Sequence, residues 1–391
     1  MSTEMQVNNK HVKDVIQATI GIYPVTSLGV SFYHYCGIDL LICRKNGVTS
    51  QLFANEPILN IKDNDHLKKI HIENGFTNGM VDALNKKVLP TAIICTPPYD
   101  FIDDMVNELT DVAVELMERD LLKSYTNLKR FYFPTIILAS NGIIYDEVVY
   151  SLQTSLQKRN IPELIIKNIY SKIVRASIMQ GAYRNNNIYF PHKKGLIKIA
   201  LPKFPLFSQV VDLLNSHKFT FSIHTNPHRI EFEKAMVNIA TNAIALVFAL
   251  DQKDYKLKAI DIKKALAPDN ATHATFVKEV QLAIFEIGKK AGAFSEIDTF
   301  EKVWYPRKEQ ILKHDSPHIT SSLHYFKNMI QTRDFPDGLP PTEYALTYPL
   351  KCFAKHYQLH DEVILLEELE KMISSNINFA RKHAKDILIT F

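Results

Sequence analysis

The pattern of apolar residues changes near residue 227, and this change constrains the fold more than any other feature. Before it, short apolar runs alternate with amphipathic segments, which is typical of a mostly parallel α/β sheet. After His224-Thr-Asn-Pro227 the period is helical almost to the end of the chain at residue 391. We therefore predict a sheet domain over residues 1–226 and a helical domain over residues 227–391.

The apolar runs of the first region predict its strands and helices. The expected strands are Val15–Gly21, Ile38–Cys43, Pro90–Thr96, Pro134–Ser140, Ile188–Phe190, Gly195–Leu201 and Phe219–Ile223. The expected helices are Phe101–Leu122, with acids in its first turn as the helix dipole prefers, and Phe204–Ser216. The clearest loop is Asp334–Pro341, which is rich in turn-forming residues.

Composition excludes several classes of protein. The chain is 46% hydrophobic and 23% charged with a formal net charge of +4, and it has no long basic run, so we expect no nucleic-acid partner. We expect no membrane span, because no uninterrupted apolar window of about 18 residues occurs. The N-terminus lacks an apolar signal core. Cys36, Cys43, Cys95 and Cys352 each lie among apolar residues without metal-ligand spacing, which predicts buried, reduced thiols, no metal and a cytoplasmic location.

Lys234, Asn238 and Asn242 form the most informative motif. Their spacing is i, i+4, i+8, which places them on one face of a helix whose other residues are mostly apolar. A lysine is rarely buried unless it is paired. One interpretation is a substrate site, in which a cationic amine and two amides hold and protonate an oxygen-rich molecule. The other is a capped or snorkelling lysine beside two satisfied core amides.

This arrangement of domains and this helix resemble the ketopantoate reductase family, which belongs to the 6-phosphogluconate-dehydrogenase-like oxidoreductases. Residues 228–250 carry the strongest similarity. The other similar stretches are Leu138–Gly142, Arg175–Gly181 with Asn187–Phe190, Thr320–Phe326 and Pro341–Tyr344. The resemblance implies an N-terminal Rossmann-like domain that binds NADPH. It also implies an all-α C-terminal domain, like that of 6-phosphogluconate dehydrogenase, which binds a small carbonyl substrate and pairs into a homodimer.

The same resemblance implies roles for individual residues. Lys234 would be the general acid that protonates the substrate oxygen as hydride adds to the carbonyl carbon. Glu343 would orient and tune Lys234 or bind a substrate hydroxyl. The implied substrate contacts are Asn141 (which would also touch the nicotinamide), Asn238, Asn242 and Ser322. From the residues alone, Glu343 could simply begin a helix, Ser322 could be an N-cap, and Asn141-Gly142 could be only a turn.

The phosphate-binding turn departs from the family pattern. A dinucleotide site favours Gly-x-Gly-x-x-Gly, because glycines let the backbone turn tightly and approach the pyrophosphate. If Gly29 takes the last position, Pro24 and Thr26 occupy the first two. Arg44-Lys45 after the second strand favours NADP, because bases there can bind the 2′-phosphate. The candidate cofactor residues are Gly21, Thr26, Ser27, Gly29, Arg44, Lys45 and Thr96.

Further departures affect the substrate side. Tyr344-Ala345 replaces the family's usual Ile-Asp, and Pro349 stands near the place of a family glycine. Extra residues around Ser124–Arg130 and Tyr150–Tyr170 could reshape the substrate cleft. Two hypotheses follow. The first is an NADPH-dependent reductase of a 2-oxo acid or related carbonyl compound. The second is a non-catalytic ligand-binding or interaction protein that keeps the fold but has lost dinucleotide binding.

Overall fold

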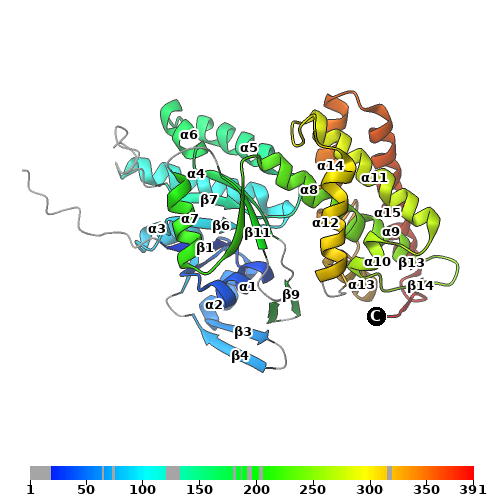
Figure 1. The fold of residues 1–391 in the computed structure, drawn as a ribbon. Coiled ribbons are helices and arrows are strands. Elements are labelled where there is room, and N and C mark those ends of the chain that lie inside the picture. Colours follow the sequence, from blue (N-terminus) through cyan, green and yellow to red (C-terminus); the bar gives the residue numbers. More distant parts are fainter. Residues whose placement is uncertain are drawn as a thin grey trace, which may run out of the picture.

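The computed structural model describes residues 19–63, 66–72, 75–119, 133–178, 182–185, 187–191, 196–201, 206–314 and 319–391. Two regions lie side by side (Figure 1): a sheet region, drawn in blue to green, and a helical region, drawn from green through yellow to red. Helix α8 (Pro227–Asn238) joins them. The predicted fold class, a Rossmann-like region followed by a helical region, is therefore confirmed.

The sheet region is built on one large sheet whose central strands are buried. Its neighbouring strands are parallel, except that β11 runs antiparallel to β8. In spatial order the strands are β12 (Thr220–His224), β11 (Leu196–Ala200), β8 (Ile173–Ile178), β7 (Thr135–Leu138), β6 (Ala92–Cys95), β1 (Ile20–Tyr23), β2 (Leu40–Cys43) and β5 (Phe76–Asn78). The register pairs Gly21 of β1 with Leu40 and Ile93, so β1 is central and the strand order reverses around it.

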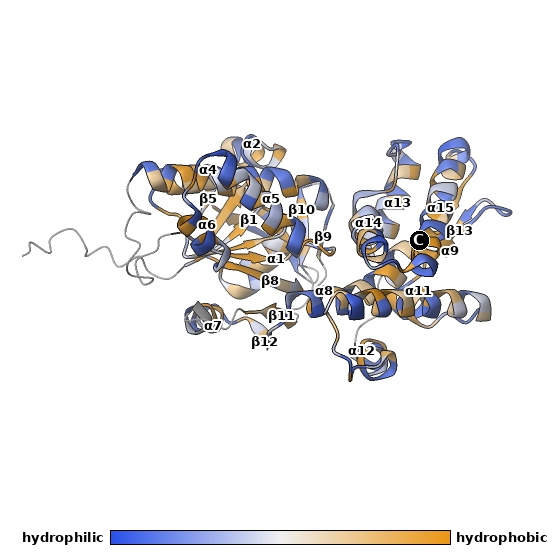
Figure 2. Cartoon of the chain, turned by 90° about the horizontal axis from the view of Figure 1, so that it is seen from above, coloured by the Kyte–Doolittle hydropathy of each residue, from blue (hydrophilic) through white to orange (hydrophobic). Residues whose placement is uncertain are grey.

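Helices cover both faces of this sheet, as a doubly wound fold requires. In Figure 2 the strands carry the hydrophobic colour at the centre of the region, and the helices turn their polar residues outward. One face packs against α3 (Met80–Asn85), α4 (Ile102–Glu118), α5 (Tyr145–Lys158) and α6 (Glu163–Tyr170). The other face packs against α1 (Ser27–Cys36), α2 (Val48–Asn55) and α7 (Leu206–Ser216). A small second sheet, β4-β3-β10-β9, lies beside α1 and comprises β3 (Ile58–Asp63), β4 (His66–His71), β9 (Ala182–Asn185) and β10 (Ile188–Pro191).

The helical region packs around the continuation of α8. That helix passes through a π-helical segment, η3 (Ile239–Ile244), into α9 (Ala245–Ala249), and most of these residues are buried in one core. The surrounding helices are α10 (Ile262–Leu266), α11 (Ala271–Lys290), α12 (Phe300–His314), α13 (Ser321–Thr332), α14 (Pro341–His356) and α15 (His360–His383). A three-stranded sheet joins the segment after α9 to the end of the chain. Its strands are β13 (Leu250–Asp251), β14 (Lys256–Leu257) and β15 (Leu388–Ile389).

Several expectations from the sequence shift in detail. The strand expected at Val15–Gly21 lies at Ile20–Tyr23, and residues 15–18 fall outside the described residues. The stretch Tyr150–Tyr170, expected to reshape the substrate cleft, lies in α5 and α6, whose buried side chains join the core of the sheet region. Ser124–Arg130 lies outside the described residues. The prediction of four buried cysteines is wrong at Cys352, which is exposed because α14 turns that face to solvent.

The change from strands to helices falls between β12 and α8. Pro227 is the first residue of α8, where its fixed φ suits a helix start, and the Asn226 side chain accepts hydrogen bonds from the N–H groups of His228 and Arg229. Yet α8 also packs against β8 and β11. The division into domains at residue 226 therefore stays a prediction.

Candidate active site

Most of the sequence-predicted residues fall in two groups. One lies at the carboxyl ends of β1 and β6, and the other lies where η3, the continuation of α8, packs against α13 and α14. In doubly wound folds, ligands bind at the carboxyl ends of the strands, beside the point where the strand order reverses. The site has two parts. The phosphate turn follows β1, and the substrate side is formed by α8, η3 and the first turns of α13 and α14.

The phosphate turn begins α1 directly after β1. A Cβ on Gly29 would lie 2.4 Å from Cγ2 of Ile22, so only glycine allows this close approach of helix and strand, as expected for the last glycine of a dinucleotide fingerprint. The Thr26 hydroxyl caps α1 by accepting from the N–H of Gly29, at 3.1 Å. It also shares a hydrogen bond of 2.8 Å with the Thr96 hydroxyl, across the ends of β1 and β6. The Thr26 and Thr96 hydroxyls therefore already have hydrogen-bond partners within the protein.

Gly21 does not belong to this turn. It lies inside β1, where a Cβ would be 2.6 Å from Cγ of Pro90, so its observed role is strand packing. Ser27 is the first residue of α1, and its side chain is partly exposed. Among the cofactor residues predicted for the turn, the structure thus brings Thr26, Ser27, Gly29 and Thr96 together.

Arg44 and Lys45 lie just beyond β2, on the outer side of the turn. The Arg44 guanidinium lies 3.8 Å from the ring centroid of Phe101 and donates to Asp104 at 3.3 Å. Lys45 is exposed, and its N–H donates to the buried carboxylate of Glu108. Glu108 also accepts from the Tyr23 hydroxyl and from the N–H of Met80. Burial raises the pKa of Glu108, against these three hydrogen bonds.

Lys234 and Asn238 lie on α8, and Asn242 lies in the π-helical segment η3. In a straight α-helix, four residues overshoot one turn by about 40°, so a stripe at i, i+4, i+8 drifts around the axis. A π-helical turn takes in an extra residue, so each residue rotates less. Asn242 therefore stays closer to the line of Lys234 and Asn238 than an unbroken α-helix would place it. Such segments occur often at functional sites.

Side chains of neighbouring helices hold this helix in place. Gln281 of α11 donates to the carbonyl of Met236 at 3.0 Å, and Thr320, at the start of α13, donates to the carbonyl of Thr241 at 2.9 Å. Asn376 of α15 donates to the carbonyl of Val247 at 2.8 Å. Each bond ties a buried polar side chain to the long helix. The Thr320 bond also fixes the start of α13, and with it Ser322, beside η3.

The Lys234 side chain is partly exposed, but protein surrounds its amine closely. Desolvation, followed by the positive charge of Arg175, lowers the pKa of Lys234 to about 7. No hydrogen bond or ion pair of its amine is found among the described residues. Glu343 is not among the groups that shift this pKa, so the expected pairing of Glu343 with Lys234 stays a prediction.

Glu343 lies in the first turn of α14 and is completely buried. Burial raises the pKa of its carboxyl to about 7, opposed by the neighbouring Ser322 hydroxyl. Neither oxygen of Glu343, nor the hydroxyl of Ser322, meets hydrogen-bond geometry with any described residue. Ser322 lies inside α13 and is not its N-cap, since Thr320 holds that position. Asn242 is buried beside both helices, because η3 packs against α13 and α14.

Asn141 is exposed at the end of β7, and Gly142 follows it with a φ of 102°. A Cβ on Gly142 would lie 2.9 Å from the carbonyl oxygen of Ala345 in α14. The glycine is therefore required both by the turn and by close contact with the helix that carries Glu343. Asn141-Gly142 forms a turn, and it places Asn141 at the joint, meaning the boundary between the sheet region and the helical region. The substrate contact implied for Asn141 stays a prediction.

Sequence reasoning missed the ion pair behind this turn. Arg175 of β8 and Glu231 of α8 are 1% and 2% exposed, and Arg175 Nε donates to Glu231 Oε1 at 2.5 Å. A signal was present in the sequence, because each charge stands inside an apolar run: Ile173-Val-Arg-Ala and Ile230-Glu-Phe. Charged residues in such runs are almost never fully buried unless they are paired.

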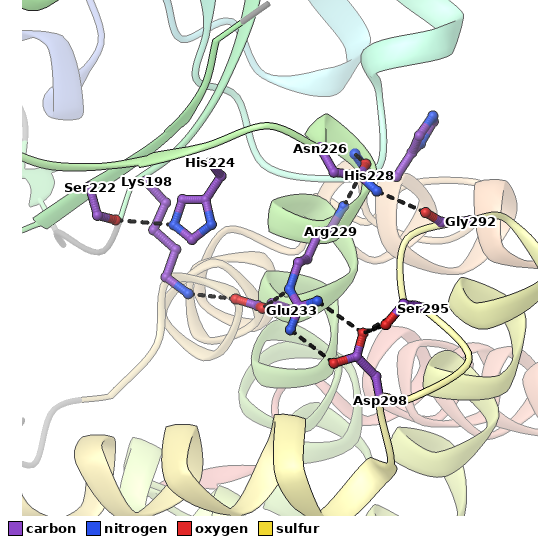
Figure 3. Close-up of polar contacts among 10 residues, drawn as sticks. All are labelled: Lys198, Ser222, His224, Asn226, His228, Arg229, Glu233, Gly292, Ser295 and Asp298. Atoms are coloured by element: carbon purple, nitrogen blue, oxygen red, sulfur yellow. Dashed lines mark hydrogen bonds and ion pairs between the residues drawn. The ribbon is translucent and has the colours of Figure 1, made fainter. Parts of the chain in front are cut away.

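A second, more exposed network crosses the joint on the side of β11 and β12 (Figure 3). Lys198 of β11 donates to Glu233 of α8 at 2.5 Å, and Arg229 bridges Glu233 to Asp298, which precedes α12. Asp298 also accepts from the Ser295 hydroxyl. This network links the edge of the sheet, α8 and the loop before α12.

Unpartnered polar atoms concentrate at the joint. Among the described residues, eight buried side-chain nitrogen or oxygen atoms have no hydrogen-bond partner, and six of them belong to elements that meet there. These six are Ser140 Oγ, His228 Nδ1, Glu231 Oε2, Ser322 Oγ and both carboxylate oxygens of Glu343. Buried polar groups are normally satisfied, so this concentration is consistent with the predicted site at the joint.

The stretch Pro227–Ala249 is long and apolar enough to cross a membrane by length and composition. However, 78% of its most apolar window is buried inside the protein. In this structure it is the central helix of a packed core.

No protein-family model and no curated protein matches the sequence. Solved structures match it over almost its whole length. D-mandelate dehydrogenase, solved with NADH and anilino(oxo)acetate, is 12% identical with a TM-score of 0.63, and the match covers 92% of this chain and 98% of that one. A 2-dehydropantoate 2-reductase from Geobacter metallireducens is 11% identical with a TM-score of 0.60, and the match covers 91% and 99%.

A third match is a dimeric ketopantoate reductase from Staphylococcus aureus. It is 12% identical with a TM-score of 0.55, and the match covers 93% of this chain and 100% of that one. These likenesses bear out the resemblance inferred from the sequence at the level of the fold: the chain has the fold of the ketopantoate reductases and of D-mandelate dehydrogenase.

Proposed function

We propose that the chain is a nicotinamide-nucleotide-dependent reductase of a 2-oxo acid or related small carbonyl compound, with Lys234 as the general acid. The observation that carries the proposal is the set of buried polar atoms without hydrogen-bond partners at the joint, together with the pKa of Lys234, which burial lowers to about 7. A group that transfers protons works best with a pKa near the working pH.

The chemistry follows from what these residues can donate and accept. When bound, a reduced nicotinamide nucleotide would supply the hydride. Protonated Lys234 would stabilise negative charge that grows on the carbonyl oxygen and would then give that oxygen its proton. Asn238, Asn242 and Ser322 would hold the polar groups of the substrate, and Asn141 would lie between substrate and nicotinamide. The orphaned carboxylate of Glu343 would accept a hydrogen bond from a substrate hydroxyl or orient Lys234.

The phosphate turn fits a dinucleotide only in part. The start of α1 can attract a pyrophosphate, with Thr26 and Ser27 supplying hydroxyls, and Gly29 makes the close packing that the motif requires. Pro24 and Thr26, however, bring side chains to the two positions where glycine would open the turn. We propose NADP as the cofactor, because Arg44 and Lys45 stand where a 2′-phosphate would lie. We also propose a homodimer in the cytoplasm; the dimeric ketopantoate reductase supports the pairing, and four free cysteines support the compartment.

One observation favours the alternative, a non-catalytic protein that binds a ligand without a dinucleotide. The Thr26 hydroxyl already serves both the Gly29 N–H and Thr96. A nucleotide phosphate would have to replace or tolerate these bonds. In that case the orphaned groups at Ser322 and Glu343 would bind a small polar ligand and perform no hydride chemistry.

The test is binding of NADPH and of NADH to the purified protein, measured by calorimetry, followed by a turnover screen of 2-oxo acids. Micromolar binding that is tighter for NADPH, together with turnover of one of these acids, would support the proposal. Absence of binding for both nucleotides would contradict it and favour the alternative. If NADPH and NADH bind with similar micromolar affinity, only the assignment of Arg44 and Lys45 to the 2′-phosphate would be contradicted.

A further inference from the structure

We propose that Arg175 and Glu231 are a positioning pair, which fixes the Asn141 turn from beneath and sets the electrostatic environment of Lys234. This inference rests on the proposed function for its catalytic meaning, but its physical content can be tested without turnover. Neither residue belongs to the set of contacts implied by the resemblance.

All the N–H groups of the Arg175 guanidinium donate hydrogen bonds. Its Nε donates to Glu231, its Nη1 donates to the carbonyls of Leu138 and Ala176 at 2.7 and 2.6 Å, and its Nη2 donates to those of Ser140 and Gly142 at 3.0 and 2.8 Å. A guanidinium has five N–H donors, so every donor is engaged. Two of these carbonyls flank Asn141 on either side, and Arg175 therefore fixes the backbone that carries its exposed side chain.

Glu231 holds the next part of the same turn. Its Oε1 accepts from the N–H groups of Ile144 and Tyr145, both at 3.0 Å, and from Arg175. Residues 139–144 form no regular strand or helix, so their backbone groups need partners from elsewhere. Together the pair binds three carbonyls and two N–H groups of the segment from residue 138 to residue 145.

Stability alone is a weak reason to use charged residues here. A buried ion pair costs desolvation energy that its attraction barely repays, and well-packed apolar residues often serve as well. A charge pair does something that an apolar pair cannot do, because it acts on other ionisable groups nearby. Arg175 is the charge that depresses the pKa of Lys234, after desolvation.

Besides Lys234 and Glu231, the charged side chains of α8 are paired. Lys198 of β11 pairs with Glu233, Arg229 pairs with Glu233 and with Asp298 before α12, and His228 lies 3.5 Å from Asp146 of α5. On the α11 side, Gln281 donates to the carbonyl of Met236, and a Cβ on Gly288 would lie 2.7 Å from the Phe232 ring. After desolvation, Arg175, which Glu231 holds, is the charged group that lowers the pKa of Lys234.

The experiment compares two single variants that move the local charge in opposite directions. Arg175→Met removes a positive charge, so the titration midpoint of Lys234 should rise by about one pH unit. Glu231→Gln leaves Arg175 uncompensated, so the midpoint should fall. The midpoint is measured as the pH dependence of trace acetylation of Lys234, read by peptide mass spectrometry, with Lys234→Arg to identify the peptide. Lys198→Met, at the neighbouring pair, should leave the midpoint unchanged.

A merely structural role predicts a different result. Loosening of the turn would admit water and move the midpoint upward in both variants, and that outcome would overturn the proposal. If Arg175→Met fails to fold, a downward shift in Glu231→Gln still supports it and an upward shift still overturns it. Hydrogen exchange at the amides of Ile144 and Tyr145 should accelerate in Glu231→Gln; unchanged exchange would overturn the positioning half. A protein that binds no nucleotide but shows these shifts would refute the proposed function and leave the positioning pair standing.

Discussion

The two parts of the candidate site satisfy their polar groups in opposite ways. On the predicted substrate side, neither Glu343 nor Ser322 meets hydrogen-bond geometry with a described residue, and the charge that, after desolvation, lowers the pKa of Lys234 is that of Arg175, which is itself paired with Glu231. At the phosphate turn, the hydroxyls of Thr26 and Thr96 bind each other, and Glu108 takes three donors. The predicted substrate side thus contains buried polar groups whose hydrogen bonds the described residues do not complete. The phosphate turn is closed on itself, and a dinucleotide must exchange bonds to enter it.

The largest expected effect tests the substrate side. Lys234→Ala should reduce turnover by about 10²- to 10⁴-fold, because a positioned general acid is lost, and it should leave nucleotide affinity nearly unchanged. In the unmodified protein, the rate of reduction should fall as the pH rises through about 7, because the acid must be protonated. Steady-state kinetics and calorimetry measure both effects. Lys198→Ala is the matched control, because Lys198 of β11 pairs with Glu233, the neighbour of Lys234 on α8. Equal losses of turnover in the two variants would contradict the role of Lys234 as the acid.

A second prediction concerns how the buried Glu343 carboxyl, which has no hydrogen-bond partner among the described residues, affects the free energy of unfolding. The pKa of Glu343 is raised from 4.5 to about 7 in the folded protein, so the folded state binds this proton more tightly than the unfolded chain. The resulting stability is present below the unfolded value and is lost as the pH rises through about 7. Glu343→Gln keeps the shape without ionising, so it should stabilise the protein above that pH by on the order of 3 kcal/mol.

Denaturant unfolding of this variant at acidic and at basic pH measures the difference. Glu370→Gln is the control, because Glu370 pairs with Lys351 and accepts from Thr347. A stabilisation by Glu343→Gln that is the same at both pH values would contradict the burial of an ionisable, unpartnered group.

The third prediction concerns packing at the phosphate turn. Gly29→Ala places a methyl group against Ile22 and should destabilise the protein by about 1–3 kcal/mol, as overpacking usually does. Gly338→Ala is the matched control, because a Cβ there meets no atom within 4 Å. Thermal unfolding compares the two. A Gly29→Ala protein as stable as the control would show that α1 can move away from β1, and so that the turn is less closed than described.

The smallest expected effect sharpens the choice of nucleotide. Arg44→Ala should weaken NADPH binding by about tenfold, the usual loss for one charge-assisted hydrogen bond, without weakening NADH binding. The binding screen described above measures it. Arg119→Ala, which removes an arginine paired with Glu115, should change neither affinity. Equal weakening of NADPH and NADH binding would mean that Arg44 supports the turn through its contact with Phe101 and does not contact the 2′-phosphate.

The sequence was sufficient for the architecture and for the helix that carries Lys234. Alternating apolar runs predicted the central strands, since a strand buried on both faces leaves a short continuous apolar segment. It was not sufficient for the small sheet beside α1, because β4 is almost entirely exposed and carries no apolar run. The spacing of Lys234, Asn238 and Asn242 predicted one stripe. The π-helical segment that keeps them in line depends on tertiary partners such as Thr320, which lie far along the chain.

The site residues divide in the same way. Gly29, Glu343 and Ser322 could be proposed because each stands in a local motif. Arg175 and Glu231 could not be paired from the sequence, because 55 residues separate them and no local pattern states which buried charges meet. Long-range pairing of this kind is decided by strand order and by the direction in which α8 leaves the sheet.

The continuity of α8, η3 and α9 has a mechanical consequence. α8 packs on β8 and β11, so a movement of the sheet region would carry Lys234 with it. Ser322 and Glu343 would move with α13 and α14. A continuous helix that packs against both regions cannot bend at its first residue, Pro227. The weakest point of this helix is the π-helical segment, where hydrogen bonding is least regular and where helices bend. Any flexing between the two regions would thus be concentrated near Asn242, so the residue that we propose as a substrate contact would also shift as the regions close.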